Sequence, residues 1–391
     1  MKQLALYDFL RHLKRNLFMG FLLAVICLLI TSLYSLFSYE YGKYKPFDEL
    51  ETNDGFFVGD KSCGGMHAFG FEQQMADRKE IEKLYQVYMG SLNTESSYYT
   101  AYIYEEWLWS NWQGRLKSGS WFDEDDVNSD TMQVIICGSI SSYNVGDIFY
   151  CETKNGRQKC VVKGILQDGT EIPFSNSYSA SDTTYTSLYS VPDKENKYVI
   201  LQKEAAERNG ISFNSAGIWA FVKYKAQTSE EQRETTNKAI ARMTLSTSYP
   251  HDIFRELSFD KLIGKLFVYI PIMAAGILLA FVSLFTVAFI NVEKGSRYYS
   301  IYYLLGGNKK ECFKIACGNV LGTVAVSVIF YMLGEILLKT YTRNQNIVYS
   351  TMAGSGMLAV SLYIVFALFL IICMYLAMRK SSPLELLKKH N

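Results

Sequence analysis

Four long apolar runs divide the chain into one large polar segment and several short ones. The runs are Leu17–Ser38, Leu266–Ile290, Ile315–Leu338 and Met357–Met378. Each has about 22–25 residues, which at a rise of about 1.5 Å per helical residue crosses a hydrocarbon core of about 30 Å. The last three runs contain no Lys, Arg or Asp, and their single acid is Glu335. The pattern predicts four membrane-spanning helices, with the first separated from the other three.

The residues before the first run predict a helix of a different kind. Within residues 1–16, Leu6, Phe9, Leu10 and Leu13 recur at helical spacing among basic side chains. This spacing is typical of an amphipathic helix lying on a membrane surface. The alternative is the positive start of a cleaved signal sequence, which needs no amphipathic spacing. No small-residue cleavage site follows the first run, so we interpret that run as a retained anchor.

The distribution of Lys and Arg predicts the topology. Basic residues lie before the first run, at both ends of residues 291–314 and within residues 379–391. By the positive-inside rule these three segments are cytoplasmic, including both termini. Residues 39–265 and the short loop 339–356 are then on the outer side.

Composition changes this picture little. The hydrophobic fraction of 49% and the net charge of +1 would suit a soluble enzyme, but the apolar residues are concentrated in the four runs. The chain is therefore expected to be a membrane protein, in contact with the lipid bilayer, that carries one large polar insert. Charge near neutrality and the lack of a basic stripe argue against a nucleic-acid partner.

The polar insert predicts a mixture of strands and helices. A turn, an apolar strand and a hairpin follow residue 118, and strands and a helix alternate after residue 197. In the helix that follows, Ser229 and Gln232 have the spacing of a capping box. The fold class is therefore an α+β outer domain with a β-rich and an α/β subdomain. The expected elements are a short helix at Asp77–Met89, strands at Ser97–Leu108, Tyr198–Leu201 and Gly217–Tyr224, and a helix at Ser229–Met243.

One hairpin in the insert carries two cysteines. Asn155-Gly156 is a strong signal for a two-residue turn. That turn would place Cys151 directly opposite Cys160 in a pair without hydrogen bonds, where Cα atoms are about 4.5 Å apart. The spacing predicts a disulfide between the two residues if the compartment is oxidising. Two reduced thiols packed side by side are the alternative.

Motifs for catalysis, metals or nucleotides are missing from the sequence. The four His are scattered, and there is no HExxH, zinc-type CxxC pairing, GxSxG or GxxxxGK[ST] motif. The acidic run 123–126 is expected to be a solvated loop. We therefore expect no catalytic residue, no metal and no cofactor in this chain, and any ATP would be bound by a separate subunit.

The segment between the second and third runs, Asn291–Lys314, is expected to be a cytoplasmic loop. Arg297–Leu305 can form a short helix with Ile301 and Leu304 on one side, and Leu305 beside them. Gly306, with a second glycine after it, would end that helix. This segment resembles the coupling segment of FtsX-like, MacB-type ABC-transporter permeases, which docks on a separate ATP-binding subunit.

The outer insert shows a similar resemblance. It resembles the small β-rich subdomain of the outer domain of MacB-type permeases, through a GxWF motif, an apolar strand, a VGD turn and a VxGIL strand. The matching residues are Gly119, Trp121, Phe122, Val145, Gly146, Asp147, Val162, Gly164, Ile165 and Leu166.

The resemblance implies a function for the chain. It implies the permease subunit of an ABC system in a bacterial plasma membrane, working by mechanotransmission with a separate ATPase and a second permease chain. Peptide export, lipophilic cargo and antimicrobial-peptide resistance all fit it. An alternative of another class is an FtsX-like regulator of a cell-wall hydrolase, or a membrane sensor without transport. A membrane-anchored enzyme is the third, for which the sequence offers no catalytic constellation.

Overall fold

The structure is a computed structural model of the whole chain. It describes residues 7, 9–50, 55–59, 68–94, 97–137, 143–174, 183–192, 197–243, 248–304, 306, 308–344 and 353–380. Residues 1–6 of the expected amphipathic helix and the tail 381–391 lie outside the described residues, as do Leu305 and Gly307.

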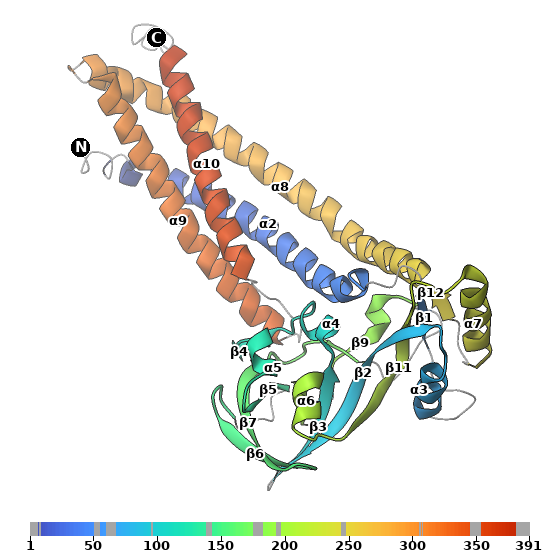
Figure 1. The fold of residues 1–391 in the computed structure, drawn as a ribbon. Helices are drawn as coiled ribbons and strands as arrows, with labels where there is room; N and C mark the ends of the chain where they lie inside the picture. The colour runs from blue at the N-terminus through green and yellow to red at the C-terminus, as the bar shows by residue number, and fades with distance from the viewer. Residues whose placement is uncertain are drawn as a thin grey trace. The chain divides into compact units, whose positions relative to one another are not determined.

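The described chain forms long helices and one large sheet (Figure 1). The helices are α2 (Leu13–Asp48), α3 (Ala68–Ala76), α4 (Glu106–Trp109), α5 (Glu124–Val127), the 3-10 helix η1 (Tyr185–Leu188), α6 (Lys203–Arg208), α7 (Glu230–Met243), α8 (His251–Leu304), α9 (Lys309–Asn344) and α10 (Ala353–Lys380). The strands are β1 (Phe56–Val58), β2 (Ile81–Asn93), β3 (Tyr98–Tyr104), β4 (Leu116–Gly119), β5 (Met132–Cys137), β6 (Ile148–Thr153), β7 (Gly156–Leu166), β8 (Ile172–Pro173), β9 (Tyr189–Ser190), β10 (Tyr198–Gln202), β11 (Phe213–Tyr224) and β12 (Ser248–Pro250).

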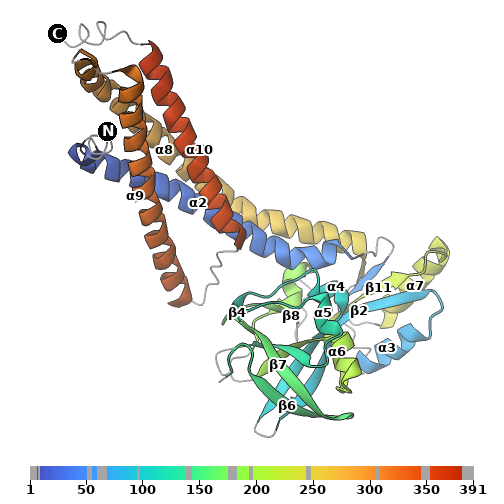
Figure 2. The same ribbon diagram turned by 60° about the vertical axis from the view of Figure 1, so that its left-hand side comes forward.

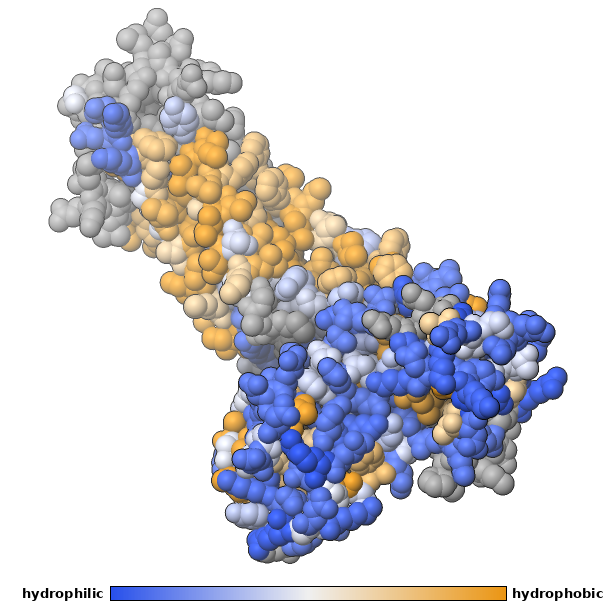
Figure 3. Space-filling model, viewed as in Figure 1, coloured by the Kyte–Doolittle hydropathy of each residue, from blue (hydrophilic) through white to orange (hydrophobic). Residues whose placement is uncertain are grey.

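Two compact units make up the chain. The helical unit consists of residues 1–38 and 266–391, and the sheet domain consists of residues 39–265. Side chains on the visible face of the helical unit are mostly hydrophobic, whereas those of the sheet domain are mostly hydrophilic (Figure 3). This division follows the apolar runs of the sequence, and it fits a membrane-bound protein with a large polar domain.

The helical unit packs α2 against α8, α9 and α10. Its core includes Leu23 and Ile26 from α2 together with Tyr363 and Leu370 from α10. A Cβ on Gly20 of α2 would lie only 3.1–3.3 Å from atoms of α9, so the absence of a side chain lets these two helices approach closely. Figure 2 shows the helices of this unit from a second side.

Several polar side chains inside the helical unit have polar partners. Asn16 on α2 donates a hydrogen bond to Asn319 on α9, with 2.8 Å between Nδ2 and Oδ1. Glu335, the one acid of the last three apolar runs, accepts a hydrogen bond of 2.9 Å from the Tyr331 hydroxyl and lies 3.6 Å from Lys339. Such pairing lowers the cost of polar groups among apolar helices.

Three helical stretches are long and apolar enough to cross a membrane. They are Leu13–Asp48, His251–Leu279 and Phe313–Tyr341 within the described residues. The fourth predicted span appears there as a shorter apolar stretch, Gly356–Ile372, within α10. Membrane-spanning helices are therefore supported, and the exact number of four stays a prediction.

Helix α8 is longer than the sequence pattern predicts. It runs unbroken to Leu304, so residues 291–304 continue the helix where we expected a loop followed by a separate short helix. Charged residues end the apolar run at Ile290, but a charge does not break a helix, and the stretch contains no proline. Helix α9 likewise continues to Asn344, into the predicted outer loop.

Ten strands of the sheet domain form one mixed sheet. The strand order is β12-β1-β11-β2-β3-β10-β5-β7-β4, and β6 lies off this path, paired with β7 and briefly with β2. Strand β10 is parallel to β3 and β5 is parallel to β7, while the other neighbours are antiparallel. The two predicted subdomains are therefore parts of a single continuous sheet.

Two hydrophobic clusters divide the sheet domain. One lies around β3, β5, β6, β7 and β10 and includes Ile103, Val134 and Val162. The other packs Phe71 of α3 and Ile240 of α7 against β1 and β11, beside which both helices appear in Figure 1. The division differs from the predicted subdomains, because β10, which was expected in the α/β part, packs in the first cluster with the hairpin strands β6 and β7.

Most expected elements of the insert are present. Strands β10 and β11 and helix α7 lie where they were predicted. The strand predicted at Ser97–Leu108 is present as β3, but it ends at Tyr104, and Glu106–Leu108 belong to helix α4. The capping box before α7 is confirmed, because Ser229 N–H donates to Gln232 Oε1 at 3.1 Å and Gln232 N–H donates to Ser229 Oγ at 3.3 Å.

The helix predicted at Asp77–Met89 is wrong. Those residues enter β2, which pairs with both β11 and β3. Ile81, Leu84, Tyr85 and Tyr88 have helical spacing, but pairing on both edges and burial of the strand centre outweigh that local pattern.

Candidate functional site

The ends of two long helices meet inside the sheet domain. Glu40 and Lys43 lie near the end of α2, and Lys265 lies on the first part of α8. Lys43 Nζ is 3.1 Å from Glu40 Oε1 and 2.7 Å from Glu171 Oε2, which precedes β8. Lys265 Nζ is 3.0 Å from Glu40 Oε2. A chain of four charges therefore joins α2, α8 and the loop before β8.

Tyrosine hydroxyls complete this network. Tyr185 donates a hydrogen bond of 2.7 Å to Glu40, and Tyr39 donates one of 3.0 Å to Glu171. Tyr189 donates a bond of 2.9 Å to the backbone oxygen of Lys43. We call the resulting set the junction cluster, which consists of Tyr39, Glu40, Lys43, Glu171, Tyr185, Tyr189 and Lys265.

The centre of the junction cluster is shielded from solvent. The side chains of Lys43 and Glu40 are 4% and 9% exposed, whereas Glu171 and Lys265 are 38% and 36% exposed. Buried charges cost several kcal/mol unless they are paired and hydrogen-bonded. Loss of one central partner would therefore leave an uncompensated buried charge, so the network holds the two helices in one arrangement.

Lys43 determines the protonation of Glu171. Burial by itself raises the pKa of the Glu171 carboxyl, but the charge of Lys43 and the hydrogen bonds from Lys43 and Tyr39 outweigh burial. The net effect lowers the pKa of Glu171 below its ordinary value. Glu171 is therefore ionised near neutral pH.

An aromatic cluster lies beside the junction cluster. Phe47, near the end of α2, is fully buried. Its ring is in contact with five aromatic rings, at centroid distances of 5.6–6.1 Å. Aromatic pairs at such distances add to the stabilisation from burial. The five partners are Trp107, Tyr189, Trp219, Phe221 and Phe254.

The sequence pattern did not predict this site, although it contains a signal for part of it. Glu40, Lys43, Tyr44 and Phe47 have the spacing i, i+3, i+4 and i+7, which places them on one helix face, and all four are buried. Two of the four are charged, so the spacing does not form a hydrophobic stripe. The partner Glu171 is distant in sequence, and only the fold brings it to Lys43.

The predicted coupling segment forms the C-terminal end of α8. Ile301 and Leu304 lie in its last turns, and Gly306 has a φ of 92°, which agrees with the predicted end of the helix. Asn308 then caps α9, because its Oδ1 accepts a hydrogen bond of 3.2 Å from Lys310 N–H. The role of Ile301, Leu304, Leu305 and Gly306 in binding an ATPase stays a prediction.

The two hairpin cysteines lie in adjacent strands, in a register that differs from the prediction. Thr153 pairs with Gly156, so the turn residues are Lys154 and Asn155 rather than Asn155 and Gly156. Cys151 is then opposite Gln158 and Cys160 is opposite Phe149. A shift of two residues keeps both cysteines on the same face, as diagonal neighbours. Their Sγ atoms are 3.4 Å apart.

The acidic run is structured and largely solvated, since Asp123, Glu124 and Asp125 are exposed and only Asp126 is buried. Asp123 caps the short helix α5, and Asp126 accepts a hydrogen bond from Asp123 N–H in return. Lys163 on β7 forms ion pairs with both carboxylates. Within the described residues there is no group of three or more His, Cys, Asp or Glu side chains arranged to hold a metal ion.

Comparisons with known proteins give two solved structures of interest. No protein-family model matches the chain, and no curated protein matches it in sequence. The chain is similar to the periplasmic region of MacB from Actinobacillus actinomycetemcomitans, with 12% identity and a TM-score of 0.25 over 52% of this chain and 90% of that one. It is also similar to the extracellular domain of the noncanonic ABC-type transporter YknZ from Gram-positive bacteria, with 12% identity and a TM-score of 0.24 over 45% of this chain and 84% of that one. Similarity at this level carries no activity over to the chain.

Proposed function

We propose that this chain is the transmembrane subunit of an ABC system of the MacB or FtsX type. In this proposal a separate ATPase binds the end of α8, and movement of α8 and α2 is passed to the sheet domain. The termini are cytoplasmic and the sheet domain is outside the cell. The cargo classes are those of the resemblance, which are peptides, lipophilic compounds and antimicrobial peptides.

The continuity of α8 is the observation that carries the proposal. The helix contains Phe254, which is fully buried in the aromatic cluster, and ends with Ile301 and Leu304 of the coupling segment. At about 1.5 Å per residue, the 54 residues of α8 follow a helical path about 80 Å long, which contains Pro271 but is not interrupted by a loop. A continuous helix of this kind transmits a displacement along its axis better than two segments joined by a loop, which supports mechanotransmission.

The junction cluster supports the same proposal at the other end of α8. Because Glu40 is bound by Lys43 on α2 and by Lys265 on α8, a displacement of α8 acts on α2 at the same place. Glu171 and Tyr189 then connect α2 to β8 and β9, which form the small second sheet. Movement of the two helices would thus reach the domain through bonded side chains.

The proposal includes a second permease chain. Each chain has one coupling segment, and such systems use two ATPase subunits. Two permease chains per complex would therefore give each ATPase subunit one coupling segment, and the small number of apolar helices per chain fits the same arrangement. The pair could consist of identical or different permease chains.

Hydrogen exchange in the assembled complex tests this function. The full chain is reconstituted with the ABC ATPase that co-purifies with it, and amide exchange is compared with and without ATP. We expect ATP to change exchange in residues 183–190, which include Tyr185 and Tyr189 of the junction cluster. A complex that hydrolyses ATP without any change there would contradict the relay. Co-purification of a wall hydrolase would instead favour the regulatory alternative.

A further inference from the structure

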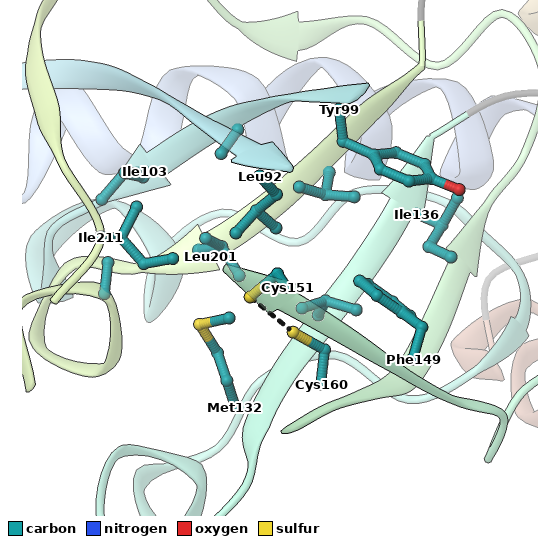
Figure 4. Close-up of a cluster of buried hydrophobic side chains, with 14 of the residues drawn as sticks. Leu92, Tyr99, Ile103, Met132, Ile136, Phe149, Cys151, Cys160, Leu201 and Ile211 are labelled. Atoms are coloured by element: carbon teal, nitrogen blue, oxygen red, sulfur yellow. Dashed lines mark hydrogen bonds between the residues drawn. The ribbon is translucent and has the colours of Figure 1, made fainter. Parts of the chain in front are cut away.

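Two buried thiols lie in contact within the core of the sheet domain. Cys151 on β6 and Cys160 on β7 are 1% and 0% exposed, and their Sγ atoms are 3.4 Å apart (Figure 4). They point toward each other among Met132, Leu201 and Phe149. A disulfide has an S–S length of about 2.05 Å, so the sulfurs need to approach by a little more than about 1 Å.

We propose that Cys151 and Cys160 are a site of disulfide formation, oxidised by thiol–disulfide exchange with an external disulfide of the dithiol-oxidase class. The proposal does not rest on the function proposed above. It does require the sheet domain to be exposed to an oxidising compartment at some stage.

The atoms and electrons of the exchange balance with the external disulfide as the only oxidant. The Cys151 thiolate attacks one sulfur of the external disulfide, which releases one thiolate and leaves a mixed disulfide on Cys151. The Cys160 thiolate then attacks Cys151 Sγ and releases the second thiolate. The two cysteines lose two electrons and two protons, and the external disulfide becomes two thiols.

Either thiol can begin the exchange. Each of the two sulfurs can donate the hydrogen bond that joins them, and both are buried in the closed core, so the attacking thiolate forms while the hairpin is open. The order with Cys160 first balances equally.

Packing around the hairpin holds the two strands in the register that makes Cys151 and Cys160 diagonal neighbours. Diagonal Cα atoms are typically about 7–8 Å apart, so closing the bond needs a small backbone shift as well as the approach of the sulfurs. At the turn, Asn155 Nδ2 donates a hydrogen bond of 3.1 Å to Arg208 O, and Lys154 N–H donates one of 3.1 Å to Gly210 O. These bonds anchor the turn to the end of α6. A hairpin fixed in this way prevents the slip that would move Cys151 away from Cys160.

The bond would reinforce a strand that the sheet holds mainly along one edge. Within the described residues, β6 pairs along its whole length with β7 but meets β2 only at Asn93 and Glu152. A disulfide would join β6 to β7, which pairs with β5 and β4 as well. Because both sulfurs are buried, the exchange occurs while the hairpin is open or still folding, and the closed core then protects the bond from reductants.

Differential alkylation of the unaltered full chain tests the proposal. Membranes are prepared from cells grown in air, free thiols are blocked with one reagent in denaturant, and disulfides are then reduced and labelled with a second reagent. We expect the second label on Cys151 and Cys160, and the first label on the buried Cys137 of β5, which serves as an internal control. The non-reduced peptide that contains both cysteines should be lighter than its reduced form by two hydrogen atoms.

The opposite labelling pattern would overturn the proposal. That pattern is the first label on both Cys151 and Cys160, in membranes and also after refolding of the chain with oxidised glutathione. A Cys151→Ser variant adds a further check, because Cys160 should then take the first label. Continued protection of Cys160 in that variant would assign its oxidation to a different partner and would also contradict the pairing.

Discussion

Glu40 on α2 and Lys265 on α8 form an ion pair with 3.0 Å between Oε2 and Nζ. The two residues are 225 positions apart in the sequence, on the helices that lead into and out of the sheet domain. Because Glu40 is also bound to Lys43 and Tyr185, the pair is part of a network rather than an isolated contact. The two helices are therefore fastened to each other where they join the domain.

Removal of Glu40 should destabilise the sheet domain strongly. Glu40→Ala leaves the buried Lys43 with one partner fewer, and we expect a loss of about 3 kcal/mol because a buried ion pair is broken. Glu171→Ala should cost about 1 kcal/mol or less, since that carboxylate is more than one-third exposed and screened by water. Thermal unfolding of the two full-length variants in detergent measures the difference. Equal melting temperatures would contradict the central position of Glu40.

The stability that Glu171 contributes should depend on pH. Its pKa is lowered in the folded state, so its contribution is present above the ordinary carboxyl pKa of about 4.3 and is lost as the pH falls through the lower folded-state pKa. Melting temperatures of the unaltered chain and of Glu171→Gln should therefore differ at neutral pH and converge in acid. A difference that grew as the pH fell would show that the sign of this linkage is wrong.

Two glycines with nearly the same backbone conformation should respond differently to substitution. Gly119 and Gly146 have φ of 88° and 90°. A Cβ on Gly119 would lie 2.2 Å from Lys163 O, whereas a Cβ on Gly146 would meet nothing within 4 Å. Gly146→Ala should cost about 1 kcal/mol for backbone strain alone, and Gly119→Ala at least about 2 kcal/mol more. Equal losses of unfolding free energy would mean that the clash at Gly119 relaxes freely.

The topology can be tested with a thiol reagent that does not cross membranes. In a background without other cysteines, Lys117→Cys lies on the exposed part of β4 and Lys309→Cys lies at the start of α9. We expect the reagent to label Lys117→Cys in intact cells and Lys309→Cys only after the cells are opened. Labelling of Lys309→Cys in intact cells would reverse the predicted orientation.

The sequence predicted the elements whose signal is local. The apolar runs predicted the long helices, and β10, β11 and the Ser229 capping box follow from composition and spacing over a few residues. The helix expected at Asp77–Met89 failed because β2 is a strand for a non-local reason, namely its two partners. The hairpin register failed by two residues because two turns fit the same sequence, and the packing of Asn155 on α6 selects between them.

The junction cluster depends even more on contacts distant in sequence. Nothing near Lys43 indicates that Glu171 lies 2.7 Å away, since 128 positions separate the two residues. Glu40, Lys43 and Phe47 have helical spacing in the sequence, but the first helix was predicted to end at Ser38, and charged residues on such a face ordinarily indicate exposure to solvent. Their burial becomes favourable only through partners that the folded sheet domain supplies.

The most direct test of the account is whether the end of α8 binds the ATPase. Leu304→Asp, alone or with Leu305→Asp, would bury a charge at the proposed contact, and we expect association with the ATPase that co-purifies with the unaltered chain to weaken at least about tenfold. Asn308→Asp is the matched control, because it adds the same charge four residues away and keeps a good helix cap. Co-purification of the ATPase with each full-length variant measures the effect, and the account predicts loss with Leu304→Asp and retention with Asn308→Asp. Undiminished association of the Leu304→Asp, Leu305→Asp double variant would contradict the account.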